Sequence, residues 1–190
     1  MRLFVAIAPP PGVLDELDAI AAPLRTARGD LRWTSREAWH VTLAFLGEVD
    51  ENALSRLLPR LERAAHRHHD IRLAFAGAGA FPMAHRANVL WSGLSGDRRA
   101  LASLAASIAA GASRAGAPPP DKRSFKPHLT LARCRLPADV TGLVAAFAGY
   151  QGQAWDVDRI HLVRSHLGAP AQPRYSTVAW WPLRGPEPAT

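Results

Sequence analysis

Apolar positions along the chain alternate between short strand-like runs and longer stretches with helical spacing. RLFVAIA is short, apolar and ended by PPPG, which predicts a buried strand, and the following LDELDAIAAPLRTA has the periodicity of a helix. WHVTLAFLG, rich in β-branched and aromatic residues and stopped by Gly47, predicts a strong strand, with LRWT as a short one before it. Asp50 then caps a helix expected over roughly 51 to 67, whose apolar face is made by Leu54, Leu57, Leu58 and Leu61.

IRLAFAGAGAF and NVLWSGL then predict two strands joined as a hairpin through Pro82. The second half of the chain repeats these ingredients, beginning with a helix expected over roughly 97 to 115. PHLTLARC predicts a further strand, followed by a helix over roughly 138 to 148 and strands near 153 to 165 and 174 to 181. Strands at short spacing with few crossover helices favour mainly antiparallel sheets, so we expect an α+β fold.

The motif His-x-Thr-Leu occurs twice, at His40 and at His128, each time on an expected strand. Side chains alternate along a strand, so His40 and Thr42 share one face, and His128 and Thr130 do the same. One copy of so short a motif is weak evidence, whereas two copies in one chain are strong. The repeat indicates two similar lobes, although similar local elements also arise without duplication.

The chemistry of the two motifs suits acid-base catalysis on a phosphate. Imidazole titrates near neutrality, so one ring can take a proton from water while the other gives a proton to a leaving oxygen. A hydroxyl two residues further on can donate to a phosphoryl oxygen without adding negative charge. The sequence shows no HExxH and no glycine-rich phosphate loop. We therefore expect neither a metal nor a cofactor.

Composition and charge set the broad class. A chain of 190 residues that is 48% hydrophobic can bury a core as one domain or as two small lobes. The apolar run at the start is too short for a secretory segment or membrane span, and Cys134 is the only cysteine. We expect a cytoplasmic monomer that does not associate with membranes. The net charge of +7 favours polyanionic partners, while most arginines are expected on a solvated surface.

The chain resembles the 2H phosphoesterase superfamily, and within it the LigT-like RNA 2',3'-cyclic phosphodiesterase family, also called 2'-5' RNA ligase. The likeness includes RLFVAI, WHVTLAFLGEV, NVLWSGL, FKPHLTLARC and LVRSHLGAPAQPRYSTVAWWPL, and so covers nearly the whole chain. It implies a single bilobal domain over 1–190, with two pseudo-symmetric lobes of mainly antiparallel sheet and outer helices around a central cleft. It also implies hydrolysis of a terminal 2',3'-cyclic phosphate of RNA to a 2'-phosphate.

The resemblance assigns roles that spacing alone leaves open. His40 corresponds to the family's proton donor to the departing 3' oxygen, and His128 to the acceptor of a proton from the attacking water. Thr42 and Thr130 correspond to the hydroxyls that hold the phosphate. A ligase reaction in the reverse direction would exchange the two histidine roles.

Four further residues are candidates for substrate binding. Arg133 matches the family's trailing arginine, and Phe45 could stack a terminal base, but strict alternation turns both away from the threonine of their own motif. A bulge or the strand end would have to re-aim Arg133, whose alternative is a surface or salt-bridging role, and core packing is the favoured role of Phe45. Tyr175 matches a family tyrosine near the cleft, with a core-edge position as the alternative. Lys126 could steer a phosphate toward His128.

Other functions stay open at this stage. The substrate could be a small cyclic nucleotide or a 2'-5' linkage to be joined, and the chain could be a non-catalytic module that binds RNA ends. The intact pairs of histidine and threonine argue against the last of these. In HRHHD, the spacing of His66, His68 and His69 lacks the i, i+4 pair that a helical metal site needs, so we expect a solvated helix end.

Overall fold

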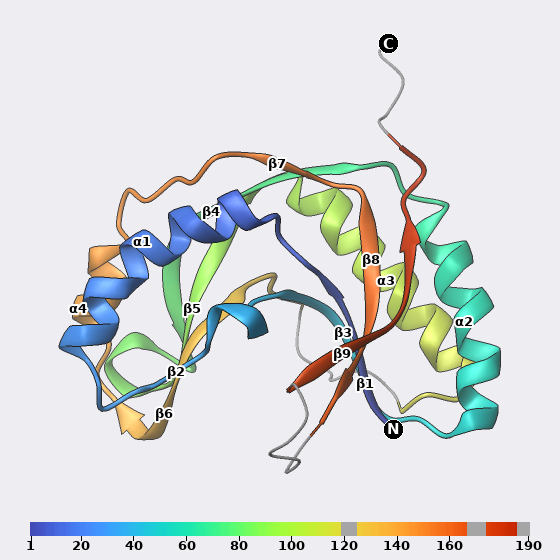
Figure 1. The fold of residues 1–190 in the computed structure, drawn as a ribbon, viewed down its shortest axis with the longest axis horizontal. Helices are drawn as coiled ribbons and strands as arrows, with labels where there is room; N and C mark the ends of the chain where they lie inside the picture. The colour runs from blue at the N-terminus through green and yellow to red at the C-terminus, as the bar shows by residue number, and fades with distance from the viewer. Residues whose placement is uncertain (119–124, 167–173, 186–190) are drawn as a thin grey trace.

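The computed structural model describes residues 1–118, 125–166 and 174–185 as one curved sheet with helices outside it (Figure 1). The sheet has nine strands in the order β7-β4-β5-β6-β3-β1-β8-β9, with β2 paired to β6. The strands are β1 (Arg2–Ile7), β2 (Arg32–Trp33), β3 (Val41–Glu48), β4 (Ile71–Phe81), β5 (Ala87–Gly96), β6 (Leu129–Ala138), β7 (Trp155–Val157), β8 (Arg159–Ser165) and β9 (Tyr175–Pro182). All the described pairings are antiparallel, as expected.

The helices lie on the outer side of the curved sheet in two groups. One group holds α1 (Pro11–Ala27) and α4 (Thr141–Ala146), and the other holds α2 (Glu51–Ala65) and α3 (Arg98–Ala115), which pack on each other (Figure 1). Two short 3-10 turns, η1 (Arg36–Ala38) and η2 (Ala84–Arg86), precede β3 and β5. The expected α+β architecture, with a curled, antiparallel sheet and outer helices, is therefore confirmed.

Most of the elements follow the sequence pattern. Asp50 caps α2 as expected, with its carboxylate accepting a hydrogen bond from the Ala53 backbone N–H at 2.7 Å. The β4–β5 hairpin forms through Pro82. The strand expected near 153 to 165 is instead two strands, because β7 pairs with β4 in one half of the sheet and β8 pairs with β1 in the other. At Asp158 the chain crosses from one lobe to the other.

Strand β1 is buried on both faces. Leu3, Val5 and Ile7 join the main core under the helices, whereas Phe4 and Ala6 point to the opposite face and form a small second cluster with Val163. We call this opposite face of the sheet the cleft face. One face of this six-residue strand therefore packs in the main core, and its other face forms part of the cleft face.

Candidate active site

The two motif strands meet at the centre of the sheet. Val41 of β3 pairs with Leu129 of β6, and both side chains are fully buried in the main core. Extending this antiparallel register by one residue places His40 opposite Thr130, and His128 opposite Thr42. Side chains opposite each other share a face, with Cβ atoms about 4.5–5.5 Å apart. Each histidine therefore lies beside the threonine of the other motif, on the cleft face.

Both imidazole rings are oriented by the backbone in the same way. His40 Nδ1 lies 2.8 Å from the carbonyl oxygen of Ala38, and His128 Nδ1 lies 2.6 Å from that of Lys126, each two residues earlier in the chain. A carbonyl oxygen can only accept, so each Nδ1 carries the hydrogen and donates it. The neutral form of each ring then presents a lone pair at Nε2, and the protonated form presents an N–H there.

Aromatic side chains enclose His40. Its ring centroid lies 4.8 Å from that of Phe4 and 5.2 Å from that of Tyr175, which meets it edge-on. Phe4 in turn lies 5.3 Å from Tyr175 and 6.2 Å from Phe45. The guanidinium carbon of Arg174 lies 5.5 Å from the Tyr175 ring centroid. This wall brings the C-terminal strand β9 against the first motif.

A second aromatic wall stands beside His128. The ring of Phe81 lies 5.0 Å away and edge-on, and the ring of Trp91 lies 6.0 Å away. Trp91 is paired with Thr130, so it shares the cleft face. Its six-membered ring covers Gly79, where an added Cβ would lie 2.3 Å from Cζ2. Only glycine at this position leaves room for the indole.

Burial lowers the pKa of both His40 and His128 below the ordinary value of 6.5. The positive charges of His128, Arg174 and Arg133 lower the pKa of His40 further, and Arg133 acts on His128 in the same direction. Because the charge on His128 affects His40, protonating one ring disfavours protonating the other. A pair that holds a single proton contains one acid and one base, which is what proton relay to and from a substrate requires.

A bulge in each motif strand corrects the expected orientation of Phe45 and Arg133. Along β1, Val5 pairs with Ala44 but Ala6 pairs with Thr42, so β3 holds one extra residue. Likewise Leu90 pairs with Ala132 and Trp91 with Thr130, which gives β6 an extra residue at the corresponding place. Each bulge turns two successive residues into the core.

The residue after each bulge consequently returns to the cleft face. Phe45 is 68% exposed and pairs with Phe4, so the expectation that it packs in the core is wrong. Arg133 is also exposed and close enough to both histidines to lower the pKa of each. Phe45 and Arg133 occupy equivalent positions, five residues after their respective histidines. The first lobe therefore presents an aromatic ring where the second presents a guanidinium.

The remaining predicted residues, Tyr175 and Lys126, lie beside the aromatic rings that flank the two histidines. Tyr175 packs on the cleft-face cluster with Phe4, and the Lys126 ammonium lies 6.0 Å from the Phe81 ring centroid. Reasoning from the sequence missed Phe4, Phe81, Trp91 and Arg174 as neighbours of the histidines. The aromatic residue type at strand positions gave a partial signal, but their face depends on pairings between distant segments.

Two histidines of the HRHHD segment make ordinary polar contacts. His68 Nε2 lies 2.9 Å from the Ser107 hydroxyl, and His69 Nδ1 lies 3.1 Å from the Gly185 carbonyl. In residues 1–118, 125–166 and 174–185, no group of three or more His, Cys, Asp or Glu side chains is placed to hold a metal ion. No helix in these segments is both long and apolar enough to cross a membrane.

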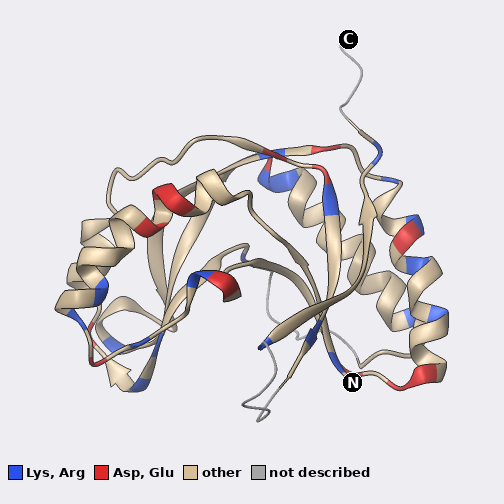
Figure 2. Ribbon diagram, in the orientation of Figure 1, with Lys and Arg blue, Asp and Glu red and all other residues tan. Residues whose placement is uncertain are grey.

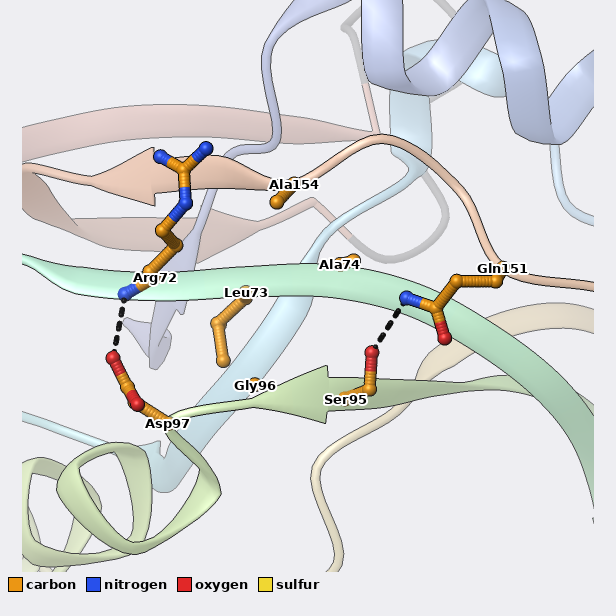
Figure 3. A pocket seen from close by; sticks show the side chains of 8 residues that line it. All are labelled: Arg72, Leu73, Ala74, Ser95, Gly96, Asp97, Gln151 and Ala154. Atoms are coloured by element: carbon orange, nitrogen blue, oxygen red, sulfur yellow. Dashed lines mark hydrogen bonds between the residues drawn. The ribbon is translucent and has the colours of Figure 1, made fainter.

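A hollow between β4, β5 and the segment before β7 lies on other elements than the histidines and offers little chemistry (Figure 3). Its polar groups are bonded to one another: the Arg72 backbone N–H donates to Asp97 at 3.3 Å, and the Gln151 amide donates to the Ser95 hydroxyl at 2.8 Å. With its polar groups engaged, it is a poor candidate for catalysis.

Five arginines pair with a nearby aspartate in the part of the chain that the structure describes. Acidic and basic positions are interspersed on α1 and α2 (Figure 2), which fits a solvated surface. The arginine-aspartate pairs are Arg25 with Asp18, Arg28 with Asp30, Arg36 with Asp15, Arg72 with Asp156 and Arg159 with Asp158. Exposed pairs of this kind contribute little to stability.

Two His-x-Thr strands that meet across a curled antiparallel sheet place the chain in the class of two-histidine phosphoesterases. A family model described as the 2'-5' RNA ligase superfamily matches residues 9–169, and the chain belongs to this superfamily. A curated relative from Thermus thermophilus, an RNA 2',3'-cyclic phosphodiesterase, is 32% identical over 192 residues, covering 97% of this chain and 91% of its own length.

Solved structures agree over nearly the whole chain. The crystal structure of TT0787 from Thermus thermophilus has a TM-score of 0.78 and 31% identity, covering 97% of this chain and 99% of its own. Escherichia coli LigT complexed with 3'-AMP has a TM-score of 0.76 and 26% identity, covering 96% of this chain and 97% of its own. The fold is thus shared with LigT-like proteins from one end of the described chain to the other.

Proposed function

We propose that the protein hydrolyses the 2',3'-cyclic phosphate at an RNA end to a 2'-phosphate, without a metal ion. The observation that carries this proposal is that the two motif strands meet at the Val41–Leu129 pair, and both imidazole rings have Nδ1 engaged by backbone with Nε2 left for chemistry. The curated relatives that carry the name RNA 2',3'-cyclic phosphodiesterase support the same substrate.

The reaction needs one proton removed and one delivered. In the proposed direction, neutral His128 takes a proton at Nε2 from a water molecule as its oxygen attacks phosphorus. The bond from phosphorus to the 3' oxygen breaks, and protonated His40 donates its Nε2 proton to that oxygen, leaving a 3' hydroxyl and a 2'-phosphate. The donor and acceptor labels follow the family resemblance. The anionic substrate favours the protonated form of the donor, offsetting the burial that lowers its pKa.

The neighbouring residues provide binding for the phosphate and the base. Thr42 and Thr130 donate hydroxyl hydrogen bonds to the nonbridging phosphoryl oxygens, and Arg133 adds positive charge where negative charge develops. Phe45, exposed on the cleft face, offers its ring to the terminal base. Tyr175 orients the His40 ring and borders the same site, and Lys126 steers the anion toward His128.

The test is a defined RNA oligonucleotide that ends in a 2',3'-cyclic phosphate, incubated with enzyme in excess chelator. We expect conversion to the 2'-phosphate, and a loss of at least about 100-fold in turnover for His40→Ala and for His128→Ala. Joined products would favour a 2'-5' RNA ligase, and turnover confined to cyclic mononucleotides would favour a small-molecule phosphodiesterase. Tight binding without product would indicate a module that only recognises RNA ends.

We further propose that residues 1–190 act as one bilobal unit, as a monomer in the cytoplasm. One sheet runs through both lobes, and the two motifs belong to different halves of it, which supports a single functional unit. Size-exclusion chromatography with light scattering tests the monomer directly.

A further inference from the structure

The cleft face continues beyond the first motif to the edge of the sheet. Thr42 pairs with Ala6, Ala6 pairs with His161, and His161 pairs with Trp180, so these side chains form one row across β3, β1, β8 and β9. Opposite residues of antiparallel strands point to the same side. At about 4.8 Å per strand, Trp180 lies about 14 Å from Thr42 along this row.

Trp180 presents a large aromatic surface at the end of the row. Its side chain is 53% exposed, and the Arg159 guanidinium carbon lies 5.0 Å from its ring centroid. Arg159 is itself held by two hydrogen bonds to the Asp158 carboxylate, at 2.9 and 2.8 Å. One face of the indole therefore rests on a fixed planar cation while much of the ring stays open to solvent.

A hollow of about 250 Å³ adjoins this platform between the end of β1 and the start of β8. It is smaller than the 300–1,000 Å³ of typical small-molecule sites, so it suits part of a nucleotide rather than a whole one. Its lining is Ile7, Ala8, Pro10, Trp155, Asp156, Val157, Asp158, Arg159 and His161. Its two carboxylates, Asp156 and Asp158, are hydrogen-bonded to Arg72 and Arg159, and their remaining lone pairs can accept hydrogen bonds from the amino groups of a base.

We propose that Trp180, backed by Arg159, is a stacking platform for a base that lies on the 5' side of the nucleotide carrying the cyclic phosphate. This inference rests on the proposed function, since it assumes that RNA occupies the cleft. Continuity of the row with Thr42 places the platform on the path of a strand leaving the histidines. Stacking accepts any base, so the subsite recognises chain length rather than sequence.

The test compares two substrates, a 2',3'-cyclic mononucleotide and a short RNA that ends in the same cyclic phosphate. We expect Trp180→Ala to lower kcat/KM about 10-fold or more for the RNA while changing it less than about twofold for the mononucleotide, which ends before the platform. Trp180→Phe should retain most of the activity on RNA. Leu136→Ala, which removes another exposed apolar side chain from the opposite lobe, is the matched control.

A binding measurement separates this inference from the proposed function. Anisotropy of a labelled short RNA ending in a 3'-phosphate reports affinity whether or not the protein turns over. If wild type hydrolyses neither substrate, the proposed function fails, yet a loss of RNA affinity in Trp180→Ala still supports the platform. Equal affinities for wild type and Trp180→Ala would overturn it, as would a wild-type dimer that Trp180→Ala converts to a monomer.

Discussion

His40 and His128 have the same surroundings in kind: a backbone carbonyl at Nδ1, aromatic rings beside the imidazole and a threonine across the strand pair. Burial dominates the lowering of both pKa values, and each ring also experiences the charge of Arg133. A free cleft at neutral pH therefore holds mostly neutral imidazoles, and the phosphate must help to recruit the proton that the donor uses.

The first residue-scale prediction concerns pH. The active form has one protonated and one neutral ring, so its population peaks between the two apparent pKa values of the pair. Because both pKa values are lowered, kcat/KM should follow a bell whose maximum lies below pH 6.5. Steady-state rates from pH 4 to pH 9 measure this. A maximum well above pH 7 would contradict the assigned direction of the shifts.

The second residue-scale prediction tests the corrected position of Phe45. Because Phe45 is 68% exposed, Phe45→Ala should change the free energy of unfolding by no more than about 0.5 kcal/mol, while raising KM about 10-fold through lost stacking. The control is Phe4→Ala: Phe4 is only 4% exposed, and its truncation should cost about 3–5 kcal/mol. Comparable destabilisation by the two variants would return Phe45 to the core.

At the scale of elements, the bulges in β3 and β6 show where sequence reasoning reaches its limit. The motif strands, the Asp50 cap and the β4–β5 hairpin are encoded locally and could be predicted. The faces of Phe45 and Arg133 depend on an extra residue in each strand, which is visible only in the pairing with β1 and β5. Alternation of side chains along a strand therefore predicted the correct face for the two histidines and the wrong face for Phe45 and Arg133, which follow the bulges.

The element-scale prediction concerns the β4–β5 hairpin. A Cβ at Gly79 would lie 2.3 and 2.4 Å from two atoms of Trp91, so Gly79→Ala must displace the indole and, with it, the wall beside His128. We expect kcat to fall about 10- to 100-fold. Adding Trp91→Phe should restore part of the loss by making space.

Gly142→Ala is the matched control for this prediction, because nothing lies within 4 Å of the Cβ that it adds. A circular dichroism spectrum and a Tm for each variant separate displacement of the wall from unfolding. Full activity of a folded Gly79→Ala protein would show that the position of Trp91 is irrelevant to the site.

In the whole molecule, one continuous sheet curves between two groups of helices (Figure 1). The repeat of the motif indicated two lobes, but the division of the chain between them could not be predicted from local pattern. The C-terminal strands illustrate this, since β7 completes the lobe of His128 and β8 completes that of His40. The crossing from one half of the sheet to the other depends on pairing with distant strands, so it could not be predicted from the local pattern near 153 to 165.

The whole-molecule prediction concerns stability in mild acid. His40, His68, His128 and His161 all have a pKa that burial lowers in the folded state. The unfolded chain protonates these rings near pH 6.5 and the folded chain only at lower pH, so unfolding takes up protons and stability falls as the pH decreases. We expect a lower Tm at pH 5.5 than at pH 7.5, and a smaller decrease in the double variant His40→Gln/His128→Gln. A Tm that rises on acidification would contradict this.

The position of the phosphate in the product is the most direct test of whether the two histidine-threonine pairs open a cyclic phosphate on RNA. Phosphorus NMR of the product from an RNA with a 2',3'-cyclic end, with chelator present, distinguishes a 2'-phosphate from a 3'-phosphate. We expect the 2'-phosphate alone, with none formed by His40→Ala or His128→Ala. A 3'-phosphate product, or undiminished turnover in either variant, would contradict it.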